Sequence, residues 1–138
     1  MKITSLFLVV FMAIAVEVAA QDYSTLLKGK RLILEDTTCA GIEFKDSKTM
    51  MMYAEMECSR GLEPTLEAKI KWLTPNLFVA IEKNRIQENC PPRNWLYEIQ
   101  NISGDKITIK EFWTGWGEFK DEILKYKIIS TLLTNNIR

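Results

Sequence analysis

The side chains that could do chemistry in this chain are its carboxylates and three cysteines, because the sequence contains no histidine. Without histidine the commonest general base is missing, and so is the usual nitrogen ligand for zinc or copper. The cysteines are too scattered for a Cys-x-x-Cys redox or metal site, and no glycine pattern matches a phosphate-binding loop. The sequence therefore predicts no catalytic residue, no metal site, no cofactor and no enzymatic activity.

Paired carboxylates are the one remaining route to hydrolysis, since glycosidases use two of them at a set separation. Glu55 and Glu57 would lie on the same face of an extended strand, two residues apart. That face is predicted to be solvated, and Glu35, Asp36, Asp121 and Glu122 are most simply read as solvated strand ends and turns. We therefore interpret these carboxylates as surface groups.

The disulfide candidates are Cys39, Cys58 and Cys90. Three is an odd number, so at most one bridge can form within the chain. We favour Cys39 with Cys58, because they flank one predicted hairpin, and leave Cys58 with Cys90 as the alternative. Cys58 falls on the inward parity of its predicted strand and Cys39 on the outward parity of the preceding one. The favoured bridge therefore requires a bulge that shifts the parity.

The N-terminus has the pattern of a secretory signal peptide over residues 1–20. Lys2 supplies the positive charge, Leu6 to Val16 is an unbroken apolar run, and Val18-Ala19-Ala20 is a small-residue cleavage site. The apolar run is short for a bilayer span. We expect cleavage before Gln21, a secreted or periplasmic product with no membrane span, and conditions in which a disulfide persists.

Residues 21–138 then make one domain of ordinary size. The formal net charge of the chain is +0, so the basic field that attracts nucleic acid or an anionic membrane surface is lacking. We expect no nucleic-acid partner.

Two stretches alternate between apolar and other residues with the period of two that is typical of a half-buried strand. In Thr49–Cys58 the even positions are all apolar, and in Thr65–Leu73 leucine, alanine, isoleucine and tryptophan alternate with glutamate and lysine. Shorter alternations and turn signals predict the remaining strands. The eight predicted strands cover residues 30–35, 40–45, 49–58, 65–73, 77–83, 94–102, 106–112 and 123–129.

Eight short strands without a convincing amphipathic helix predict an all-β fold, and closure into an antiparallel up-and-down barrel would remove the exposed sheet edges. A two-sheet β-sandwich is the alternative. In number and order of strands the chain resembles a small secreted bacterial lipocalin-like (calycin) β-barrel. Gly29-Lys30-Arg31 keeps the glycine of the Gly-x-Trp motif on the first strand of that family, with arginine in place of tryptophan. This resemblance implies a barrel that binds one small molecule.

A possible small apolar ligand is suggested by inward-facing methionines and aromatics, because methionine adapts to varied apolar shapes. The alternative is that these residues are packed core. Residues closer to the open end would meet the ligand and those closer to the closed end would meet each other. The predicted ligand-binding residues are Met50, Met52, Met56, Trp72, Trp95 and Tyr97.

Two loops suggest other roles. Pro91, Pro92 and Arg93 present an arginine on a stiff stem, which could be an interaction loop for a protein partner or a protease. The cluster Trp113–Gly117 could be a stacking platform or a structural corner. The sequence thus favours a secreted, non-enzymatic binding protein for a small apolar or amphipathic ligand, with a protein-interaction or inhibitor module acting through Cys90–Arg93 as the alternative.

Overall fold

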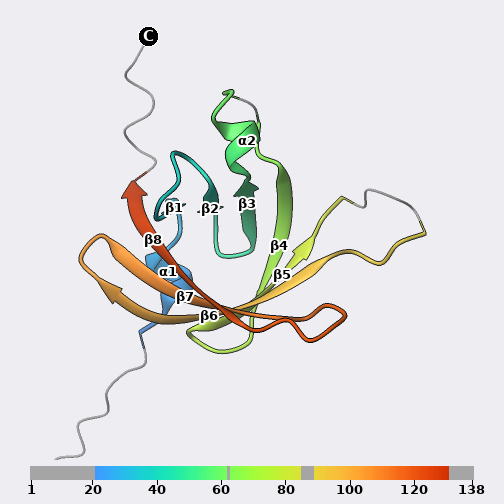
Figure 1. Cartoon of the computed structure of the whole chain (residues 1–138). Coiled ribbons are helices and arrows are strands. Elements are labelled where there is room, and N and C mark those ends of the chain that lie inside the picture. The colour runs from blue at the N-terminus through green and yellow to red at the C-terminus, as the bar shows by residue number, and fades with distance from the viewer. Residues whose placement is uncertain (1–20, 62, 85–88, 131–138) are drawn as a thin grey trace, which may run out of the picture.

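The protein is an eight-stranded antiparallel up-and-down β-barrel that closes by pairing its last strand with its first (Figure 1). The computed structural model describes residues 21–61, 63–84 and 89–130; the predicted signal peptide lies outside these residues. Because the last strand pairs with the first, the predicted barrel is confirmed and the alternative two-sheet sandwich is wrong. Its strands are β1 (Lys30–Leu34), β2 (Gly41–Phe44), β3 (Thr49–Tyr53), β4 (Leu66–Trp72), β5 (Leu77–Glu82), β6 (Asn94–Ser103), β7 (Lys106–Phe112) and β8 (Glu122–Ser130).

The predicted alternation sets which side chains enter the barrel. Met50 on β3 is fully buried, and its neighbours across the sheet, Phe44 on β2 and Ala68 on β4, are also buried. The same parity continues through the other strands, so the interior is built from alternate residues of all eight. The core consists of Leu27, Leu32, Ile42, Phe44, Met50, Ala68, Ile70, Phe78, Ala80, Tyr97, Ile99, Ile107, Ile109 and Tyr126.

Loop length distinguishes the two ends of the barrel. Short turns at residues 45–48, 73–76 and 104–105 join strands at one end, and longer connections at 35–40, 54–65, 83–93 and 113–121 join them at the other. The short helix α1 (Tyr23–Leu26) lies at the short-turn end, where the Tyr23 backbone N–H donates to the Pro75 carbonyl. Leu27, directly after α1, is buried in the core. We call the short-turn end the closed end and the other the open end.

Aromatic side chains fill the interior toward the closed end. The rings of Phe44, Trp72 and Phe78 pack against one another with centroids 4.8–6.4 Å apart, and Phe78 also packs on Tyr97 at 5.3 Å. The Trp72 indole N–H donates to the Ser47 carbonyl in the turn between β2 and β3, 3.0 Å away. This packing fills the interior toward the closed end.

The predicted strand Thr49–Cys58 is wrong at its C-terminal end. Strand β3 ends at Tyr53, and residues Glu55–Cys58 form the short helix α2, which stands beyond the end of β3 (Figure 1). The side chains of Glu55 and Cys58 both bind the loop between β1 and β2. These tertiary contacts stabilise the helix, although the alternation of polar and apolar residues over Glu55–Cys58 also fits a strand. No helix in the described part of the chain is long and apolar enough to cross a membrane.

At Gly41, the first residue of β2, the backbones of β1 and β2 are too close for a side chain. Its φ is +150°, and a Cβ at this position would overlap the backbone carbonyl oxygen of Leu32 on β1. At Gly104 the φ is +62° and no atom lies within 4 Å of such a Cβ.

We expect Gly104→Ala to lower the free energy of unfolding by about 1 kcal/mol through backbone strain alone. We expect Gly41→Ala to lower it by at least about 3 kcal/mol, because backbone atoms must move apart. Urea unfolding followed by circular dichroism measures both. Equal losses for the two variants would contradict the packing described for β1 and β2.

Candidate ligand-binding site

A cavity of about 290 Å³ opens at the end of the barrel that carries the long loops. Pockets that hold small molecules have volumes from roughly 300 Å³ upward and are mostly apolar with a few placed polar groups; this cavity is close to the lower limit in volume and has the same kind of lining. Apolar side chains of β1 to β4 form one wall, and aromatic side chains of β6 and β8 form the other. Its main lining side chains are Leu34, Ile42, Met52, Leu66, Arg93, Trp95, Tyr97, Glu111 and Tyr126.

Three of the six predicted ligand-binding residues meet in this cavity. Met52 enters it from β3, and Trp95 and Tyr97 enter it from β6. Met50 and Trp72 share the inward parity but belong to the packed part of the barrel, where Met50 is 0% exposed and Trp72 contacts Phe44 and Phe78. Met50 and Trp72 therefore lie in the core toward the closed end, and Met52, Trp95 and Tyr97 line the cavity toward the open end.

Met56, the remaining predicted residue, lies outside the barrel. It is on α2 and its side chain is 65% exposed. Its predicted inward position rested on a strand that ends at Tyr53, so the helix carries it away from the interior.

Glu111 supplies a carboxylate to the mostly apolar and aromatic cavity. It is on β7, opposite Tyr97 of β6 and Glu122 of β8, and the Tyr97 hydroxyl lies beside its carboxylate. Burial raises the pKa of Glu111; the Tyr97 hydroxyl opposes this shift, and the charge of Glu122 adds to it. Burial also raises the pKa values of Tyr97 and Tyr126. Among the described residues Glu111 has no ion-pair partner.

Arg93 also reaches the cavity, but its guanidinium is bound to Glu82. Arg93 Nε and Nη2 lie 3.1 and 2.9 Å from the two carboxylate oxygens of Glu82, and the Arg93 backbone N–H donates to the same carboxylate at 3.0 Å. The side chain of Glu82 is only 3% exposed. Hydrogen bonds from Arg93 lower the pKa of Glu82, and the pKa of Arg93 is raised in turn. The charge of Arg93 is therefore balanced inside the chain.

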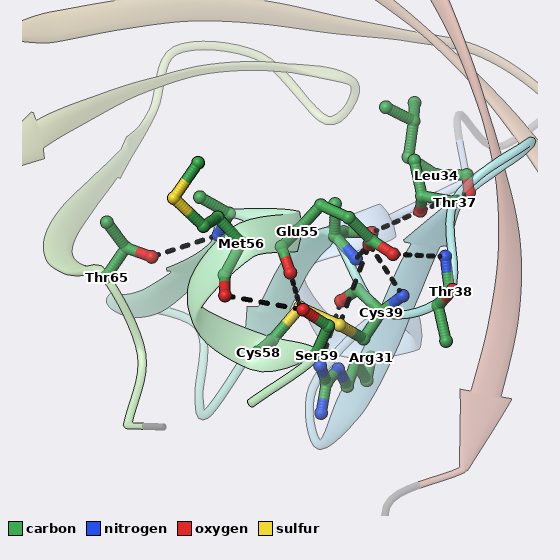
Figure 2. Close-up of a disulfide and its surroundings, with 12 residues drawn as sticks. Arg31, Leu34, Thr37, Thr38, Cys39, Glu55, Met56, Cys58, Ser59 and Thr65 are labelled. Carbon is green, nitrogen blue, oxygen red and sulfur yellow. Dashed lines mark hydrogen bonds between the residues drawn. A yellow bond between two sulfur atoms is a disulfide. The ribbon is translucent and has the colours of Figure 1, made fainter. Parts of the chain in front are cut away.

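A carboxylate and a disulfide fix the rim of the cavity beside β1 and β2 (Figure 2). The Glu55 carboxylate accepts backbone N–H groups from Thr38, Cys39 and Ala40 at 3.0, 3.0 and 2.9 Å. These bonds, the bond from Cys39 first, lower the pKa of Glu55 to about 2. Cys58, three residues further along α2, forms the disulfide with Cys39. Because Ala40 lines the cavity, this clamp positions part of its edge.

The favoured Cys39–Cys58 disulfide is thus confirmed, but it forms without the predicted bulge. Cys39 lies in the loop before β2 and Cys58 lies on α2, so the disulfide does not join residues on opposite faces of two strands. Cys90 is exposed. The two bridged sulfurs and a Glu55 oxygen lie close enough together to suit a metal ion, but a metal requires thiolates, and the disulfide removes both.

An arginine on the outside of the barrel connects the clamp to the wall. Arg31 of β1 stacks its guanidinium 4.0 Å above the Tyr53 ring and donates from Nη2 to the Cys39 carbonyl at 3.0 Å. The Tyr53 hydroxyl donates to Glu43 at 2.6 Å. These contacts hold the end of β3 and the disulfide loop against the first two strands.

Sequence reasoning missed three of these features. The alternation of Ile107, Ile109 and Glu111 places the glutamate on the inward parity, and this signal was available in the sequence. Tyr126 likewise follows the parity of its predicted strand. Glu55 carried no such signal, because its partners are backbone groups of a loop 15 to 17 residues earlier.

The geometry defines an eight-stranded barrel with a small, mostly apolar cavity at one end. Comparison with protein-family models, with curated proteins and with solved structures found no match.

The Glu55 clamp predicts a stability that depends on pH. The pKa of Glu55 is lowered from 4.5 to about 2 in the folded chain, so the carboxylate stabilises the fold fully above pH 4.5. That stabilisation is lost as the pH falls from about 4.5 toward 2. We expect Glu55→Gln to lower the urea midpoint at pH 7, and the difference from wild type to shrink at pH 2.5.

Glu118→Gln, which removes a carboxylate from the exposed loop between β7 and β8, is the control and should leave the midpoint at pH 7 nearly unchanged. A Glu55→Gln variant as stable as wild type at pH 7 would show that the clamp is dispensable.

Proposed function

We propose that this chain is a secreted, non-enzymatic, lipocalin-like protein that binds one small apolar or amphipathic molecule at the open end of its barrel. The observation that carries the proposal is the cavity itself, in which Met52, Trp95 and Tyr97 converge from strands far apart in the sequence. Its apolar lining favours ligands with a hydrocarbon or aromatic body, because burying such a body removes apolar surface from water.

Two further observations support the proposal. The aromatic packing around Phe78 and the rim clamp at Glu55 hold the cavity from both sides, so that it is preformed. A ligand then binds without the cost of ordering the site. The Cys39–Cys58 disulfide fits the oxidising compartment that secretion implies.

The alternative, an interaction module acting through Cys90–Arg93, has less support. It requires an arginine that is available to a partner, whereas two of the guanidinium nitrogens of Arg93 are bound to the buried Glu82 carboxylate. Pro91 and Pro92 then serve to lead the chain into β6.

Adjacent methionines on β3 give a matched test of the cavity. Met52 lines it, and Met51 has the opposite parity and faces outward. We expect Met52→Gln, which keeps the volume but adds an amide, to weaken the binding of decanol about tenfold, since burying an unpaired polar group costs roughly 1–2 kcal/mol. Met51→Gln should bind decanol as wild type does. Isothermal titration calorimetry measures the three affinities.

Decanol is one member of a panel that also includes a fatty acid and haem. If wild type binds no member of this panel and carries no small molecule in native mass spectrometry after periplasmic expression, the proposed function is wrong. Equal losses for Met51→Gln and Met52→Gln would place binding elsewhere.

A further inference from the structure

We propose that the ligand of this cavity carries a positively charged ammonium group, held by the Glu111 carboxylate among the rings of Trp95, Tyr97 and Tyr126. This inference rests on the proposed function and adds the chemical class of the ligand.

The first argument is the arrangement of aromatic rings around the carboxylate. Trp95 and Tyr97 come from β6 and Tyr126 comes from β8, on either side of the strand that carries Glu111. The negatively polarised faces of aromatic rings attract ammonium groups, and aromatic cages are a known means of binding quaternary ammonium. An alkyl or aryl body would then lie against Met52, Leu34 and Ile42.

The second argument is the balance of charge in the cavity. Among the described residues, two ionisable groups other than tyrosine line it, Arg93 and Glu111. Arg93 is neutralised by a bidentate pair with Glu82, whereas within the same residues Glu111 has no ion-pair partner and faces the neutral Tyr97 hydroxyl. The neighbouring Glu122 adds a second negative charge. The cavity therefore has a carboxylate for which a ligand can supply the counter-charge.

The third argument is the desolvation of that carboxylate. Glu111 is partly buried, and the tyrosines beside it are 2% and 4% exposed. Charge pairs are stronger in such surroundings than in water, and a buried carboxylate repels an anionic ligand. The same geometry thus favours an ammonium head group over a carboxylate head group on the same hydrocarbon chain.

Three chain-matched probes separate head group from body: decyltrimethylammonium, decanol and decanoate. Calorimetry on the wild-type protein at pH 7.5 should show decyltrimethylammonium binding at least about tenfold more tightly than decanol, and decanoate binding weakest. Glu111→Gln should remove most of the advantage of the cation, so that the ratio of its affinity to that of decanol falls to within about twofold. Glu98→Gln is the matched control, because Glu98 has the outward parity on the adjacent strand β6.

A pH series keeps the inference testable if Glu111→Gln does not fold. The charge of decyltrimethylammonium is fixed, so a change in its affinity reports on the protein. The affinity should fall as the pH is lowered toward 4.5 and Glu111 is protonated, while that of decanol stays constant.

The groups that face Glu111 are Tyr97 of β6, Glu122 and Tyr126 of β8, and Arg93 with its partner Glu82; Lys120 and Asp121 share the adjacent hollow. Glu122→Gln measures the contribution of the second carboxylate.

The outcomes separate the two proposals. If decyltrimethylammonium and every member of the panel fail to bind, and no small molecule is carried by the protein, the proposed function is wrong; if decyltrimethylammonium alone fails to bind, the inference about the ammonium group is overturned. If decanol binds as tightly as decyltrimethylammonium, or decanoate binds most tightly, the cavity takes up apolar molecules and the inference about the ammonium group is overturned. An affinity for the cation that changes neither with pH nor with Glu111→Gln overturns it as well.

Discussion

Closure of the barrel is the constraint on which the rest of this structure depends. Because β8 pairs with β1, every inward side chain must be accommodated in one enclosed space. Toward the closed end that space is filled by the rings of Phe44, Trp72 and Phe78, with Leu27 beside α1 adding to the core. The cavity of about 290 Å³ lies at the other end, where the longer loops join the strands.

At the open end, the segments beside β1 and β2 are joined by a disulfide and by hydrogen bonds. Helix α2 follows β3 and is tied back to the loop between β1 and β2 twice, by the Cys39–Cys58 disulfide and by the Glu55 carboxylate. Arg31 on the outside of β1 then holds the same loop through the Cys39 carbonyl. These contacts fix the position of Ala40, which lines the cavity edge beside β1 and β2.

The fold could be predicted from the sequence because strand parity is a local property. Alternation placed Met50 and Met52 inside and Met51 outside, and turn residues marked the ends of most strands. Position along the barrel axis could not be predicted, since it depends on the stagger between strands; hence Met50 and Met52 seemed equivalent although only Met52 lines the cavity. The helix at Glu55–Cys58 could not be predicted for a different reason. Its apolar and polar residues alternate as in a strand, and tertiary contacts determine its conformation.

Two inward-facing glutamates show how identical side chains acquire different roles. Glu82 and Glu111 both have the inward parity of their strands, and both lie near the open end. Arg93 follows the long loop between β5 and β6 directly opposite Glu82 and donates to both of its oxygens, so that glutamate has its counter-charge within the chain. Opposite Glu111 stand Tyr97 and Glu122, one neutral and one of like charge. The first carboxylate joins β5 to the start of β6 through Arg93, and the second lines the cavity without a counter-charge among the described residues.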